Sequence, residues 1–221
     1  MKNIYVMVLT AALLLAGTQA KAQLMIGAGY LNSAETLTNT SSNNAEKADL
    51  NGFYAGASFN IPIVAGLGIA PGVYASMLFG QTSSSYNGTL VSASSSNKYN
   101  EMAINAPVNL TFSYKVNRDF KVFAYAGPVF QYGLSSKNTL DGKASIGGIT
   151  IGSDTPTVVD NYNGDDASRN PFNIYLGGGA GIQAGSLQVI LGYDHSMTNI
   201  TKLSNYQQSR SQIKVGFGLA F

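Results

Sequence analysis

Hydrophobic residues occupy alternate positions in about eight segments of the chain, and polar stretches separate these segments. Alternation with a period of two is the pattern of a β-strand that has one apolar face. The clearest segment is the last, where every second residue from Ile213 to Phe221 is apolar. The predicted strands lie near residues 24–30, 52–59, 67–79, 104–114, 120–134, 172–182, 187–194 and 212–221.

The connections between these segments alternate in length. Short turns follow the second, fourth and sixth strands, at 61–66, 115–119 and 184–186. Long polar connections follow the first, third, fifth and seventh strands, at about 34–50, 81–98, 136–170 and 196–209. An even strand number, with short turns at one end and long loops at the other, is typical of a closed up-and-down antiparallel transmembrane barrel. The sequence therefore predicts an all-β barrel of about eight strands, with short periplasmic turns and long extracellular loops.

The two faces of the predicted strands differ in a second way. Aromatic residues on the apolar face gather near the strand ends, as expected of rings at the two boundaries of a membrane. Those near the long connections are Tyr30, Phe53, Phe79, Tyr132, Phe172 and Tyr193, and those near the short turns are Phe59, Phe112, Tyr114, Phe120 and Phe221. The other face alternates glycine with tyrosine, as in the run from Gly52 through Tyr54 to Gly56. An eight-stranded barrel leaves room inside only for side chains, so we expect tyrosine rings over glycine backbone to fill the lumen.

Residues 1–22 have the pattern of a secretory signal peptide. Lys2 precedes an apolar run, 4–16, that is too short for an ordinary membrane helix, and small residues at Ala20 and Ala22 fit a cleavage site before Gln23. The expected mature domain is 23–221. Cleavage of the signal peptide removes two of the 13 basic residues and leaves 11, which equals the number of acidic residues. The mature domain therefore has no net positive charge that would favour nucleic acid as a partner.

Composition narrows the chemistry. Only 11% of residues are charged, against about 25% in ordinary soluble domains. The chain has no cysteine and one histidine, which excludes disulfides, thiolate metal sites and multi-histidine metal sites. We therefore expect no cofactor and no metal. The segment 160–166 (DNYNGDD) carries calcium-type ligands, but it lacks the spacing of an EF-hand loop and suits ordinary turns.

Taken together, these features resemble the small outer-membrane β-barrel proteins of Gram-negative bacteria, the group with OmpX-like and OmpA-like members. The resemblance covers 23–221, and the C-terminal strand ending at Phe221 is its most specific part. The segment 104–127, with the runs APVNL and FAYAG, looks like the porin-family barrels of Bacteroidetes. The resemblance implies an outer-membrane location, lipid and lipopolysaccharide as neighbours, and recognition of the last strand by the barrel-assembly machinery.

Charged residues on the inward face are the candidate site. Lys214 falls in mid-strand, where a lone ammonium group is costly to bury, so it needs a partner. Pairing the last two strands about Leu203 sets Asp194 opposite Gln212 and diagonal to Lys214 and Arg210. Glu101, at the long-loop end of the fourth strand, is a second possible partner. This lumen charge network could be a structural ion pair in a filled lumen, which we favour, or a constriction that selects permeants.

A catalytic role is not favoured. His195 and Ser196 suggest a lipid-modifying hydrolase, but adjacent residues of a strand point to opposite faces. The expected function is non-enzymatic: surface interaction, adhesion or envelope structure, carried by loops that contact an extracellular ligand or a host surface. The alternative is a narrow channel for small or apolar solutes.

Overall fold

The computed structural model describes residues 22–221, apart from 88–90, 147–148, 152–155 and 164–166. The predicted signal peptide, 1–22, lies almost entirely outside these residues and stays a prediction. Among the described residues, no helix is both long enough and apolar enough to cross a membrane.

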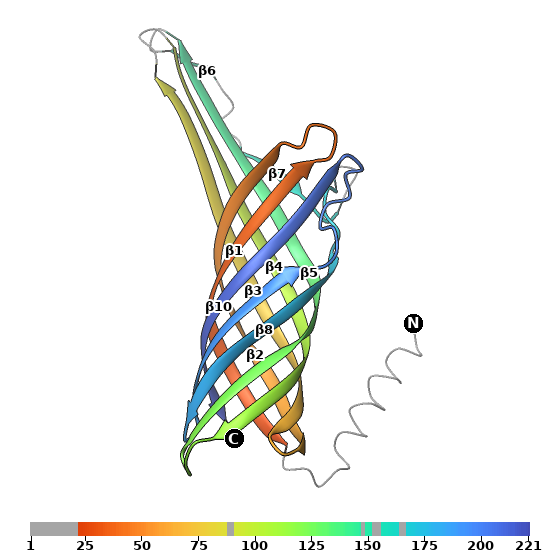
Figure 1. Cartoon of the computed structure of the whole chain (residues 1–221). Coiled ribbons are helices and arrows are strands. Elements are labelled where there is room, and N and C mark those ends of the chain that lie inside the picture. Colours follow the sequence, from red (N-terminus) through yellow and green to blue (C-terminus); the bar gives the residue numbers. More distant parts are fainter. Residues whose placement is uncertain (1–21, 88–90, 147–148, 152–155, 164–166) are drawn as a thin grey trace.

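Eight long strands form one closed antiparallel ring (Figure 1). They are β1 (Gln23–Asn39), β2 (Ala45–Val64), β3 (Leu67–Asn87), β4 (Val91–Lys115), β5 (Phe120–Ile146), β8 (Phe172–Ala184), β9 (Leu187–Ser196) and β10 (Tyr206–Ala220). Each pairs with its sequence neighbour in the ring, and the β1–β10 pairing closes it. Two short strands, β6 (Ile149–Ile151) and β7 (Thr157–Asp160), pair with the upper part of β5. The predicted eight-stranded up-and-down barrel is confirmed.

Most apolar side chains of the ring point outward. Val73 on β3 is 58% exposed and Phe217 on β10 is 62% exposed. Both predicted groups of aromatic residues also lie on this outer face, with Tyr30 and Phe53 in edge-to-face contact across β1 and β2. Polar residues and glycines face the interior. The hydrophobic face is therefore the outside of the barrel, the reverse of a soluble protein.

Tight turns join the strands at one end, which we call the short-turn end. Ala65 and Gly66 between β2 and β3 have φ of +39° and +87°, and Gly185 between β8 and β9 has φ of +59°. Positive φ in a two-residue connection matches the right-handed twist of the strands it joins. All three predicted short turns are present, although β2 runs on to Val64 before turning.

The opposite end, which we call the long-connection end, differs from the prediction in detail. The sequence predicts loops at 34–50 and 81–98, but most residues of these segments continue the strands. The pairing of β3 with β4 runs up to Asn87 and Ser92, and that of β4 with β5 up to Val91 and Ile146. Strands β3, β4 and β5 therefore project beyond the rest of the ring (Figure 1). Because both faces of this projection are polar, the sequence carries no alternation there.

Tyrosine rings lie over glycine backbone inside the barrel, as predicted. A Cβ atom on Gly29 would lie 2.7 Å from the ring of Tyr54, and one on Gly192 would lie 2.4 Å from the Tyr125 hydroxyl. At Gly192 the tyrosine hydroxyl alone takes the space that a side chain would need, whereas at Gly29 the backbone of β10 is closer still than the ring. The filling is incomplete, however, because a cavity remains in the half of the lumen nearer the short turns.

Candidate functional site

A buried cluster of four charges crosses the lumen at the long-connection end. Arg210 on β10 donates from Nη1 to Glu101 Oε1 at 2.6 Å and from Nε to Glu35 Oε1 at 2.7 Å. Arg169 donates to the same two carboxylates, at 2.6 Å to Glu35 and 3.2 Å to Glu101. We call these four residues the charge cluster. It joins β1, β4 and β10 across the interior with a residue from outside the ring.

Two arginines and two glutamates leave the charge cluster neutral. Tyr99 on β4 adds a hydroxyl that contacts Glu101 and accepts from Arg169 Nη1 at 2.5 Å, while the guanidinium lies 4.7 Å from the centre of its ring. Gln208 donates to Glu35 at 2.9 Å. Buried charges are tolerated only when paired and hydrogen-bonded, and these groups meet that condition.

Arg169 reaches the cluster from the connection between β7 and β8. The backbone of that connection is hydrogen-bonded to β5, because Asn161 N donates to Ser136 O. Arg169 N in turn donates to Asn161 O within the connection. The segment also bridges to the β9–β10 connection through Arg169 and Thr201. Tyr162 inserts beside Gly133, where a Cβ atom would lie 2.2 Å from its ring. This connection therefore folds down into the barrel mouth.

A small apolar layer borders the charge cluster. Leu31, Leu50 and Leu78 are buried together inside the barrel. Tyr99 of the charged region packs on one part of this layer, and Tyr54, which lines the cavity, packs on another. We call the three leucines the leucine layer. The three leucines come from the adjacent strands β1, β2 and β3; Leu78 is paired with Glu101 and Leu31 lines the cavity, so this apolar wall connects the charges to the cavity.

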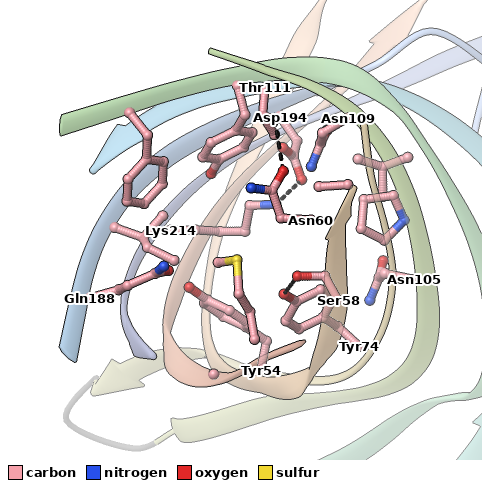
Figure 2. A pocket seen from close by; sticks show the side chains of 18 of the residues that line it. Tyr54, Ser58, Asn60, Tyr74, Asn105, Asn109, Thr111, Gln188, Asp194 and Lys214 are labelled. Carbon is pink, nitrogen blue, oxygen red and sulfur yellow. Dashed lines mark hydrogen bonds and ion pairs between the residues drawn. The ribbon is translucent and has the colours of Figure 1, made fainter. Parts of the chain in front are cut away.

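The four predicted site residues fall into two separate groups. Arg210 and Glu101 belong to the charge cluster, whereas Lys214 Nζ lies 2.5 Å from Asp194 Oδ2 in the cavity wall (Figure 2). Asp194 faces Gln212 across β9 and β10. Glu101 therefore pairs with Arg210 and Arg169, and Lys214 takes Asp194. A role of either group in selecting permeants stays a prediction.

Glu35, Arg169 and Tyr99 belong to this site but are not among the residues predicted from the sequence. Glu35 continues the inward phase of β1 after Leu31 and Ser33, so extending the alternation past Tyr30 would have found it. Tyr99 lies likewise on the extension of β4. Arg169 lies outside the strands, and no periodic signal marks it.

His195 and Ser196 do not form a catalytic pair in this geometry. The His195 side chain is on the outer face, where Nδ1 lies 2.9 Å from Ser211 Oγ. Ser196 is buried and its hydroxyl accepts from Arg210 N at 2.8 Å. The two side chains thus point to opposite faces of β9, which is what their adjacency predicts.

The calcium-type segment is only partly described. Asp160 accepts from the backbone amides of Tyr162 at 2.9 Å and Asn163 at 3.2 Å, which makes a turn. The amide of Tyr162 holds the pKa of this carboxyl below its ordinary value. Asp165 and Asp166 lie outside the described residues. Within the part of the chain that the structure describes, no three acidic, histidine or cysteine residues come together to hold a metal ion.

Comparison with known proteins gives a family and several solved barrels. Residues 19–202 match the model of the outer membrane protein beta-barrel domain. The search of curated proteins gives no match. Among solved structures, Ail, the attachment invasion locus protein of Yersinia pestis, solved with the heparin analogue sucrose octasulfate, is 12% identical, with 90% of this chain and 99% of that chain covered and a TM-score of 0.42.

Two further barrels are similar in the same way. Neisserial surface protein A is 13% identical over 90% of this chain and 97% of its own, with a TM-score of 0.39. The N-terminal β-barrel domain of OprF from Pseudomonas aeruginosa is 11% identical over 87% of this chain and 97% of its own, with a TM-score of 0.34.

Proposed function

Because this chain belongs to the outer membrane protein β-barrel domain family and so lies in the bacterial outer membrane, we propose that it serves there as a non-enzymatic surface protein. In this role the barrel is a closed anchor, and the extracellular ends of its strands contact other molecules or support the envelope. The short-turn end then faces the periplasm and the long-connection end faces outside.

The charge cluster is the observation that carries this proposal. Arg169, Arg210 and both glutamates occupy the lumen, and the leucine layer lines the wall of β1, β2 and β3 beside them. A hydrated ion that passed this point would have to separate buried ion pairs, each of which is costly to break. A barrel closed in this way offers its outer surface rather than a pore.

The projection formed by β3, β4 and β5 supports a role in contact. It stands beyond the outward aromatic residues Phe79 and Tyr132, and its exposed side chains are mainly serine, threonine, asparagine and lysine. Rigid scaffolds commonly carry recognition on the segments that extend into solvent. The partner that we propose for this projection is an extracellular ligand or a host surface.

Single-channel recording in planar bilayers tests the proposal. We expect the protein purified from outer membranes to give no stable conductance. The variant Glu35→Ala/Arg169→Ala, which removes one charge of each sign from the cluster, provides the comparison because it stays neutral and leaves Arg210 with Glu101. Discrete and stable open levels in the unaltered protein would favour the alternative, a narrow channel for small solutes.

A further inference from the structure

The half of the lumen nearer the periplasm contains a cavity of about 120 Å³. Figure 2 shows Tyr54, Tyr74 and Gln188 around it and the Lys214–Asp194 pair in its wall. By the same measure a single water needs about 10–15 Å³, so the cavity has room for on the order of ten waters. We call this space the chamber.

Several buried polar atoms in the chamber wall have no partner in the protein. They are Asn109 Oδ1, Gln188 Oε1, Asp194 Oδ1 and Gln212 Nε2. Asp194 and Gln212 are 3% and 4% exposed. Leaving a buried polar group unsatisfied costs about 1–3 kcal/mol, and more for a charged group. These atoms have almost no accessible surface of their own, so they lie behind the open space, whose exposed wall is mostly carbon with Lys214 as a partly exposed charge.

The chamber wall also contains one ion pair, Lys214 with Asp194. Lys214 has one hydrogen-bond partner, Asp194, although an ammonium group can donate three bonds. Asp194 in turn uses only one of its two carboxylate oxygens. This ion pair is therefore half satisfied by protein, in contrast to the charge cluster above it. Water in the chamber would supply the two missing bonds of the Lys214 ammonium group, whose side chain is 21% exposed.

Accessibility of inward side chains changes along the barrel. On β5, inward Lys121, Phe123 and Tyr125 are partly exposed, whereas Val129 and Gln131 further up are buried. On β1 the same change occurs between Gly29 and Leu31. Lys121 and Ser113, both beside the periplasmic turns, line the chamber. Inward Ala70, Gln188 and Ala220 on other strands stay buried at this depth, so the open space reaches the periplasmic rim along β4 and β5.

We infer that the barrel is a blind aqueous half-channel: the chamber holds water, opens to the periplasm, and is closed to the outside. This inference rests on the proposed closure of the extracellular end, but it adds that periplasmic solutes can reach the barrel interior as far as Ser58 and the Lys214–Asp194 pair. Water is the occupant that the partly exposed Lys214 ammonium group requires.

Cysteine accessibility tests this inference directly, because the chain has no cysteine of its own. The probe is sulfonatoethyl methanethiosulfonate, an anionic and membrane-impermeant thiol reagent that the Lys121 side chain at the rim should attract. Ser58→Cys and Thr111→Cys place thiols in the chamber wall. Ser41→Cys, on the exposed β1–β2 connection, reports the extracellular side. Mass spectrometry measures the loss of free thiol.

We expect both chamber thiols to be modified from the periplasmic side and to stay free when reagent is added outside, with Ser41→Cys showing the reverse. Modification of Thr111→Cys but not of Ser58→Cys would overturn the inference, since the chamber would then be sealed from the rim. The proposed function would survive that result if the protein remained non-conducting. Modification of Ser58→Cys from both sides would overturn the half-channel and the closed barrel together. If Ser58→Cys fails to fold, as judged by heat-modifiable gel mobility, Asn105→Cys replaces it in the chamber wall.

Discussion

Arg210 binds both glutamates of the charge cluster. Its guanidinium is 1% exposed and donates to Glu35 and Glu101 at once, from strands that lie on different sides of the lumen. A guanidinium has five donors in a fixed planar fork, so it can serve two carboxylates in one conformation. Arg169 repeats this pattern from the connection above. Each carboxylate is thereby held by both arginines.

Replacing Arg210 with alanine should therefore destabilise the barrel. We expect Arg210→Ala to lower the free energy of unfolding by about 3–5 kcal/mol, because Arg169 alone must then compensate two buried carboxylates. Urea unfolding in lipid vesicles, followed by gel mobility, measures the change. Arg118→Ala, in the exposed turn before β5, is the matched loss of an arginine and should change little. Equal effects of the two substitutions would show that the cluster contributes no net stability.

The upper parts of β3 and β4 form a hairpin that extends beyond the rest of the ring. From Gly80 upward β3 pairs with β4 alone, because its pairing with β2 begins at Phe79. The lower ring therefore does not depend on this hairpin for backbone pairing. Deletions in such projecting segments are tolerated when the backbone they remove is not needed elsewhere.

We expect a shortened hairpin to leave the barrel intact. Thr82 faces Asn97, so replacing 83–96 with Asn-Gly joins them through a two-residue turn. The variant should keep heat-modifiable mobility and a free energy of unfolding close to that of the full chain, while binding to any partner of the projection is lost. Loss of folding in this variant would mean that the hairpin is part of the barrel's stability, in which case the projection is not a separable contact surface.

The strands inside the lipid could be predicted and their extensions could not, for one physical reason. Where one face meets lipid and the other the lumen, residues such as Val73 and Tyr74 must alternate in polarity. Above that level both faces meet water, so the serine-rich run 83–85 forms a strand through backbone pairing without alternation. The same limit explains the site. The alternation of polarity along β10 and β4 predicts that Arg210 and Glu101 face inward. Arg169 lies in a connection without alternating polarity, so the sequence does not predict where its side chain points.

The whole molecule is organised around a hydrophobic outside. Exposed aliphatic side chains such as Val73 and Leu191 lie on the ring between the two groups of aromatic residues, while the inside holds ion pairs, tyrosines and the chamber. Exposing such a surface to water would be unfavourable, so folding and lipid insertion are one process for this chain. A charge on the outer face should then cost most where the surrounding hydrocarbon is thickest.

Lysine scanning of the outer face tests that placement. Val73 lies midway along the lipid-facing part of β3, six residues from both Leu67 and Phe79, and Val73→Lys should lower the free energy of unfolding in lipid by about 2–4 kcal/mol. Met197, just past the end of β9 at the extracellular rim, is 64% exposed, and Met197→Lys should cost about 0–1 kcal/mol because its ammonium group reaches water. Equilibrium unfolding in vesicles gives both values. Equal costs at the two positions would mean that the apolar ring does not face lipid, and the membrane placement of the barrel would have to be abandoned.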